Sequence, residues 1–302
     1  MKQLIPLTAL ALIAACQHVP ADAPAAPAVE TPAEVAAAPP PAPTPGQQWL
    51  FASAEASVAL RQDWAGIAAY VEETAAGPRP NASVVLSRVG TAGLQTFLPC
   101  GDKPYAAVFD ADETLIWNLG AMSAFTRMGT EFDPAIWNEW ERTGAGKAVP
   151  TPGALDGLAR IRAAGVTVIV NTNRAAENAE GTEATLTAAG IGDFEHGSSL
   201  FLRGDTPDGS GKDLRRERIS DDYCVIALVG DQLGDISDVF NQRGLSPSKR
   251  KEMTSRPGYE TLWGNGWFVL PNPIYGPSIA GDIDDVFPAG TDWAPPAAEP
   301  AQ

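Results

Sequence analysis

The first periodic segment of this chain predicts a helix. Within residues 53–78, apolar side chains recur at the three- and four-residue spacing of one helical face, at Leu60, Trp64, Ile67 and Val71. A Gly-Pro pair at positions 77 and 78 then stops the pattern, as expected where a helix ends. The segment is therefore expected to pack one apolar stripe against a core.

After this helix the chain alternates between short apolar runs and longer amphipathic segments. Strands are expected at residues 105–110, 166–173, 199–203, 224–231 and 266–272, and further helices at 151–165, 176–190 and 211–219. The main strands are apolar throughout, which indicates burial on both faces of a sheet. The sequence thus predicts an α/β domain, with a parallel sheet flanked by helices, over about residues 49–286.

The N-terminal segment MKQLIPLTALALIAAC has the pattern of an export signal. It carries Lys2, an apolar run too short to span a bilayer, and small residues before Cys16. The last four residues resemble the lipobox of bacterial lipoproteins, so residues 1–15 are expected to be cleaved and Cys16 to be lipidated. An ordinary signal with a chance cysteine is the alternative. The residue after Cys16 is Gln17 and not Asp, so the resemblance implies sorting to the outer membrane, on its periplasmic or its surface side.

Residues 16–48 then form the lipidated cysteine and an Ala/Pro-rich linker, because this stretch has no apolar periodicity and its prolines favour extended geometry. Residues 287–302 are expected to be a disordered tail. Multiple acyl chains on Cys16 would anchor the protein stably to a membrane.

Composition limits the classes of partner. The chain is 44% hydrophobic with eight tryptophans, which is ample for a core. Its formal net charge of −16 argues against a nucleic-acid polymer as partner. A small phosphorylated substrate stays compatible, because a metal ion or a few cations reverse the field locally. Besides Cys16, the chain contains Cys100 and Cys224, each shortly before a predicted strand. Because export leads to a compartment that permits disulfides, a disulfide between these two cysteines and a pair of buried thiols are both open.

Reactive side chains follow three of the predicted strands. Asp110, Thr172 and Asp231 each come at a strand end, and the carboxyl ends of parallel strands meet at one edge of a sheet. With Asp112 and Asp235, four carboxylates converge there and require a cation. Oxygen ligands of this kind suit Mg²⁺. A zinc site is disfavoured, since the two histidines are far apart in sequence.

These groups suit transfer of a phosphoryl group. Asp110 is placed to attack phosphorus, and Asp112 to protonate the leaving oxygen and then activate water. Thr172 offers a hydroxyl to a phosphoryl oxygen, and Lys212 a positive charge. Activity in the acid range is expected, since a general acid needs its proton.

The motifs D-x-D-x-T, a Thr after the second strand, a Lys and G-D-x-x-x-D resemble the four motifs of the haloacid dehalogenase-like (HAD) phosphatases. Within them the chain is similar to the class C bacterial acid phosphatases, the lipoprotein 5′-nucleotidase family. The segments that carry this likeness are WLFASAEASVAL, VFDADETLIWN, NTNR, KDLRRERI, LVGDQLGD and FVLPNPIYG. Thr172 replaces the usual serine, and PSIAG follows Tyr275-Gly276 where Trp-Glu is usual, so the leaving-group preference is not fixed by the resemblance.

The resemblance implies a HAD-like Rossmannoid fold with a small helical cap or insertion after the first motif. It implies Mg²⁺ held by the side chains of Asp110 and Asp231 and by the carbonyl of Asp112, with Asp235 a direct or water-mediated ligand. It also implies hydrolysis of small phosphomonoesters, nucleoside 5′-monophosphates among them, through an aspartyl-phosphate intermediate.

Several assignments keep an alternative. Arg215 and Arg216 are the alternatives to Lys212 as the cation, and Asn173 and Arg174 either orient the phosphate or cap the next helix. Five aromatic residues are candidates for contact with the leaving group, Tyr275 first among them, although most aromatics are core: Trp117, Phe125, Trp137, Trp140 and Tyr275. The insertion at 121–144 forms either a cap over the site or ordinary structure.

The sequence therefore predicts an exported, lipid-anchored, Mg²⁺-dependent acid phosphatase. A phosphatase or phosphotransferase of narrow specificity is the alternative on the same fold. A surface lipoprotein that binds a ligand without catalysis is the alternative from another class. The oligomeric state is not fixed by the sequence.

Overall fold

The computed structural model describes residues 41–88, 95–287, 289–291 and 293–295. The predicted signal peptide, Cys16 and the linker up to residue 40 lie outside the described residues, as does most of the predicted tail. Within the described ranges, no helix combines the length and the apolar character that crossing a membrane requires.

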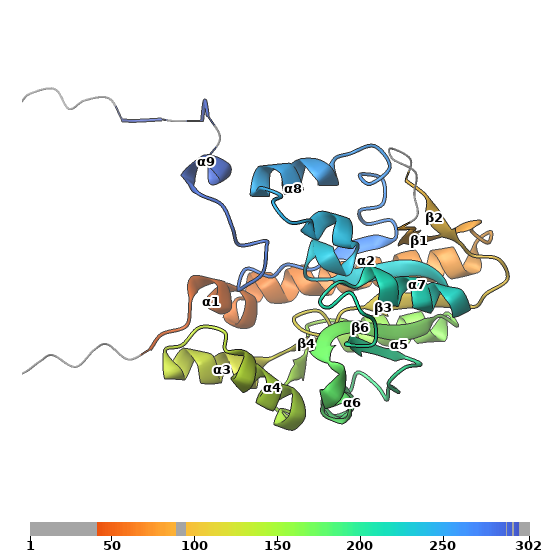
Figure 1. The fold of residues 1–302 in the computed structure, drawn as a ribbon, viewed down its shortest axis with the longest axis horizontal. Coiled ribbons are helices and arrows are strands. Elements are labelled where there is room, and N and C mark those ends of the chain that lie inside the picture. Colours follow the sequence, from red (N-terminus) through yellow and green to blue (C-terminus); the bar gives the residue numbers. More distant parts are fainter. Residues whose placement is uncertain (1–40, 89–94, 288, 292, 296–302) are drawn as a thin grey trace, which may run out of the picture. The chain divides into compact units, whose positions relative to one another are not determined.

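A parallel sheet of five strands organises the domain, in the order β7-β6-β3-β8-β9. Its strands β3 and β6 are adjacent (Figure 1). The strands are β3 (Tyr105–Phe109), β6 (Thr167–Ala175), β7 (Leu200–Arg203), β8 (Cys224–Gly230) and β9 (Trp267–Val269). All five overlap the apolar runs in the sequence, which confirms the predicted α/β class. The central strand β3 pairs with β6 on one side and β8 on the other, so the first and last acidic motifs follow adjacent strands.

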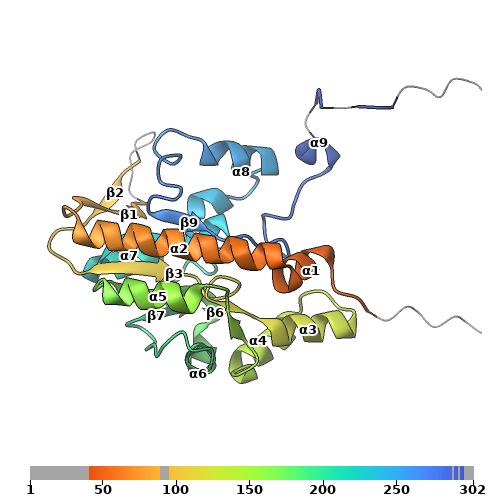
Figure 2. The same cartoon turned by 180° about the vertical axis from the view of Figure 1, so that it is seen from behind.

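Helices cover both faces of this sheet. The helices α2 (Ala54–Ala76) and α5 (Ala154–Ala163) lie over one face (Figure 2), while α7 (Asp213–Asp222) lies over the other. Residues of β3 alternate between the two sides: Ala107 and Phe109 join the core under α2 and α5, and Ala106 and Val108 join the opposite core. The alternation explains why an entirely apolar strand is required here. The remaining predicted helix is α6 (Ala179–Ala188), after a short 3₁₀ turn η1 (Ala176–Asn178).

Other elements were not predicted individually. A helix α1 (Pro45–Ala52) begins before the expected domain start at Trp49, with Thr44 as its N-cap. The insertion after the first motif forms α3 (Leu119–Met128) and α4 (Pro134–Thr143). The rest are β1 (Ala82–Leu86), β2 (Phe97–Pro99), β4 (Ile116–Trp117), β5 (Val149–Pro150), η2 (Leu233–Asp235), η3 (Asp238–Asn241), α8 (Pro247–Thr254) and α9 (Ile283–Val286).

Cys100 and Cys224 form a disulfide, the first of the two arrangements that the sequence left open. Cys224 is the first residue of β8 and pairs in register with Tyr105, the first residue of β3. The bridge therefore ties the start of β8 to the segment shortly before β3, at the edge of the sheet opposite Asp110.

Candidate active site

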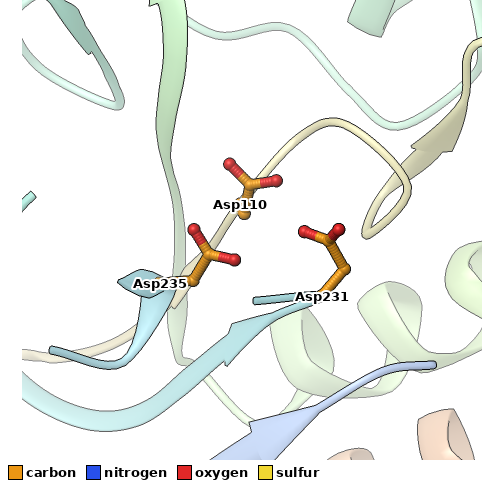
Figure 3. Close-up of side chains that lie close together, drawn as sticks. All are labelled: Asp110, Asp231 and Asp235. Atoms are coloured by element: carbon orange, nitrogen blue, oxygen red, sulfur yellow. The ribbon is translucent and has the colours of Figure 1, made fainter. Parts of the chain in front are cut away.

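Three carboxylates converge at the carboxyl edge of the sheet. Asp110 directly follows β3, Asp231 directly follows β8, and Asp235 ends the 3₁₀ turn η2 (Figure 3). Their carboxylate oxygens include a set that lies within 4.8 Å of one another. The convergence follows from the pairing of β3 with β8, which brings the ends of both strands together.

The approach of Asp235 depends on the glycine that ends β8. A Cβ at Gly230 would lie 2.1 Å from the Asp235 Cβ and 2.4 Å from its Oδ2. That oxygen accepts a hydrogen bond from the backbone N–H of Gln232 at 2.9 Å, which fixes the tight turn. Only glycine leaves room for the carboxylate to fold back over the strand end, and this accounts for the glycine in G-D-x-x-x-D.

Lys212 is the cation at this cluster. Its buried Nζ donates to Asp110 Oδ1 at 2.5 Å and to Asp235 Oδ1 at 2.7 Å. The two alternatives from the sequence lie elsewhere. Arg215 donates to the carbonyl of Thr172 and to the side chain of Asn173, and Arg216 donates to backbone carbonyls of η2 and to Asp213.

The cluster holds more negative charge than its protein partners balance. Burial, opposed by Lys212 and reinforced by Asp235 and Asp112, raises the pKa of Asp110 to about 7. Burial, and then the charges of Asp235 and Asp110, likewise raise the pKa of Asp231 well above its usual value. Three oxygen donors around one point, with a single ammonium beside them, therefore fit a divalent cation.

Asp112 points differently from the other three aspartates. Its Oδ1 accepts bonds from Arg174 Nε at 2.9 Å and Asn118 Nδ2 at 2.9 Å, and Arg174 Nη2 lies 2.8 Å away. Its side chain is outside the carboxylate cluster and still lines the same cavity. A separate acid or base beside the cluster is compatible with this placement, and the predicted role of the Asp112 carbonyl stays a prediction.

The C-terminal end of β6 holds the remaining predicted residues. Thr172 is completely buried, and its Oγ1 accepts a bond from the backbone N–H of Arg174 at 3.2 Å. Asn173 lines the cavity, whereas the guanidinium of Arg174 is buried against Asp112 and Asn118. Contact of Asn173 and Arg174 with substrate stays a prediction.

Sequence reasoning missed three polar residues around the aspartates, namely Asn272, Glu113 and Asn118. Asn272 donates to Asp231 Oδ2 at 2.6 Å. Glu113 has a left-handed backbone conformation, with φ at 57°, and accepts from the backbone N–H of Asn118 at 3.0 Å and from the hydroxyl of Tyr275. Burial, and then the neighbouring Asp112, raise the pKa of Glu113 to about 7. The available signal for this group was its position inside the motif, between Asp112 and Thr114.

A cavity of about 930 Å³ opens above the cluster. Besides Asp110, Asp112, Asp231, Asp235 and Lys212, the helices α3 and α4 and the loop between them line it, through Met122, Phe125, Thr126, Phe132 and Trp137. The insertion is thus a wall of the site. Two of the aromatic candidates do not line the cavity: Trp117 packs against Phe51, and Trp140 donates a hydrogen bond to Asn118. Tyr275 also lines the cavity.

Comparison with known proteins gives the family. Residues 53–278 match the model of the acid phosphatases of the HAD superfamily, subfamily IIIB. The chain belongs to this family. The matched region includes both acidic motifs, the end of β6 and Lys212, so this acid phosphatase carries the expected set of residues in one domain.

Solved structures agree with the fold. The chain is similar to the class C acid phosphatase from Bacillus anthracis, with a TM-score of 0.59 and 22% identity over 77% of this chain and 84% of that one. The tungstate-bound form of the same enzyme gives a TM-score of 0.59 and 21% identity over the same shares of the two chains. No curated protein matches the sequence significantly.

The raised pKa of Asp110 predicts how the stability of the metal-free acid phosphatase depends on pH. The pKa of this carboxyl is 3.8, its usual value, in the unfolded state and about 7 in the folded state, so the folded state binds the proton more tightly. The contribution of Asp110 to the free energy of unfolding is therefore complete below the unfolded-state pKa and is lost as pH rises from about 4 through about 7. In chelator, Tm should therefore fall as pH rises across that window. Asp110→Asn should reduce the slope without removing it, since Asp231 and Glu113 also have raised pKa values. A wild-type Tm that rises over this range would contradict the expectation.

Proposed function

We propose that this acid phosphatase hydrolyses small phosphomonoesters, nucleoside 5′-monophosphates among them, with Mg²⁺ as cofactor and a phosphorylated Asp110 as intermediate. The observation that carries the proposal is the meeting of three carboxylates and one ammonium at the base of a single cavity. The shape of this cavity supports an organic leaving group, since its volume is in the range of small-ligand sites and one wall is aromatic.

In the first step, a carboxylate oxygen of Asp110 attacks phosphorus. The bond from phosphorus to the ester oxygen breaks, and that oxygen takes a proton from Asp112 and leaves as an alcohol. Lys212, which contacts Asp110 directly, stabilises negative charge that moves onto the phosphoryl oxygens. Thr172, near the end of β6, would donate its hydroxyl to a phosphoryl oxygen.

In the second step, water attacks the phosphorylated Asp110. Asp112 takes the proton of this water, the bond between phosphorus and Asp110 breaks, and phosphate leaves. The sum of both steps is ester plus water giving alcohol plus phosphate, with both aspartates restored. The side chains of Asp110, Asp231 and Asp235 would hold the Mg²⁺ ion, which when bound supplies positive charge for the phosphoryl oxygens.

The proposal is tested by phosphate release from a panel of nucleotides, sugar phosphates and aryl phosphates. With chelator, kcat/KM should fall by about 10²-fold or more because an electrostatic stabiliser is removed. Addition of Mg²⁺ should restore it, with higher rates at acidic than at alkaline pH. Hydrolysis unaffected by chelation would contradict the metal requirement, and one strongly preferred ester would show the narrow-specificity alternative.

We further propose that the enzyme is exported and lipid-anchored at the outer membrane through Cys16. The N-terminal sequence supports this, and the Cys100–Cys224 disulfide is compatible with an oxidising compartment. Cys16→Ser should move the enzyme from the membrane fraction to the soluble fraction; unchanged fractionation would overturn the proposed anchor.

A further inference from the structure

Asp112 is held by one of its two carboxylate oxygens. Oδ1 contacts Arg174 Nε, Arg174 Nη2 and Asn118 Nδ2, all within 2.9 Å. In the described part of the chain, nothing donates a hydrogen bond to Oδ2, and Asp112 lines the cavity. One oxygen is therefore fixed by the protein and the other stays available to a substrate.

The two donors are themselves fixed from several elements. Asn118 is completely buried, and its Oδ1 accepts from Arg174 Nη2 at 2.8 Å and from Trp140 Nε1 at 2.8 Å. Its Nδ2 also reaches Glu113, whose other oxygen accepts from Tyr275. The first motif, the end of β6, α4 and the segment after β9 are thus joined in one hydrogen-bonded network that includes Asp112.

Structural stability alone does not account for Arg174. Its side chain is completely buried and its Nη1 has no hydrogen-bond partner among the described residues. Burial of an unpaired N–H is unfavourable, and an aliphatic side chain of similar size would avoid that penalty. What the arginine does provide is a rigid planar fork directed at Asp112.

We infer that Arg174 and Asn118 are positioning residues that hold Asp112 so that its free oxygen faces the ester oxygen of the leaving group. This inference rests on the proposed function, because it assigns the two residues to the proton transfer carried out by Asp112. It differs from a substrate-binding role, in which the guanidinium would contact the phosphoryl group itself.

The dependence of the rate on the leaving group separates these roles. An alkyl phosphate such as glycerol phosphate needs a proton on its leaving oxygen, whereas para-nitrophenyl phosphate releases a stable phenolate without one. The parameter to compare is kcat/KM, which reports the steps up to departure of the alcohol or phenolate. The second step is common to both esters, so kcat is a poorer probe.

For Arg174→Gln we expect kcat/KM to fall by about 10²-fold for glycerol phosphate and by less than about 5-fold for the nitrophenyl ester. Inhibition by inorganic phosphate should stay unchanged. Arg174→Lys should recover part of the loss, and Asn118→Ala should show the same pattern more weakly. Adding Arg174→Gln to Asp112→Asn should cause no further loss with glycerol phosphate, since both changes remove the same function.

The matched control is Arg160→Gln on α5, where an arginine pairs with Glu72 at the surface. It should leave both esters unaffected. Equal losses on the two esters, or weaker inhibition by phosphate in Arg174→Gln, would overturn the positioning role. If Arg174→Gln does not fold, Asn118→Ala applies the same criterion. Failure of the wild type to hydrolyse either ester would instead contradict the proposed function.

Discussion

Replacement of Asp110 by Asn should abolish turnover and leave the fold intact. The change removes the proposed nucleophile, and loss of a nucleophile commonly lowers kcat by about 10⁴-fold or more. The fold should tolerate it because burial already raises the pKa of Asp110 to about 7, so a neutral isostere relieves repulsion from Asp235 and Asp112. The measurements are kcat for several esters and Tm with and without Mg²⁺.

The control for this variant is Asp102→Asn, which changes an exposed carboxylate in the turn before β3. It should retain wild-type activity and stability. If Asp110→Asn still released phosphate at an undiminished rate, the nucleophile would have to be another residue. A large loss of Tm in that variant would show that Asp110 is needed for folding as well.

Removal of the Cys100–Cys224 disulfide should have the largest effect on stability. The bridge closes a loop with a sequence separation of 124 residues. In the chain-entropy model, a loop of that size stabilises the folded state by about 5 kcal/mol. The double variant Cys100→Ala/Cys224→Ala should therefore lose about 10–20 °C in Tm, given about 2–4 °C per kcal/mol for a domain of this size.

Activity should survive this loss wherever the variant is folded, because the bridge and Asp110 lie at opposite edges of the sheet. Wild-type protein with its disulfide reduced is the control and should match the double variant in Tm. An unchanged Tm would mean that the bridge adds no stability. A loss of kcat/KM at temperatures where the variant is folded would show coupling between the two edges.

The sheet was predictable because its strands leave a strong local signal. Strands such as β3 and β8 are buried on both faces and are accordingly apolar at every position. The antiparallel pair of β1 and β2 gave no such signal, since both strands are only partly buried and β2 has only three residues. Their pairing depends on contacts made elsewhere in the domain, which local propensity does not contain.

The reactive part of the site was predictable for a related reason. Asp110 and Asp231 each follow a strand, and the parallel arrangement alone brings strand ends together. The supporting residues were not predictable in this way. Asn272 and Asn118 act through hydrogen bonds to aspartates whose positions depend on the path of the loops. Asparagine is common in loops without such a role, so its presence there is not a signal.

Sequence spacing also could not tell which aromatic residues line the cavity. Spacing did not distinguish Trp140, whose N–H is bonded to Asn118, from Trp137, which lines the cavity three residues earlier. Phe132, which also lines the cavity and is 66% exposed, gave no signal as a candidate. The face that α4 turns to the site depends on its packing against α6, β6 and η1.

Asn272 and Tyr275 donate hydrogen bonds to Asp231 and Glu113, which precede them by long stretches of chain. The catalytic centre is therefore completed late in biosynthesis. A nascent polypeptide that has not yet been extended past these positions lacks the contacts to Asp231 and Glu113. Shortened products ending before β9 should thus be inert even where the earlier strands have formed. The site is complete only when the segment that follows β9 is also in place.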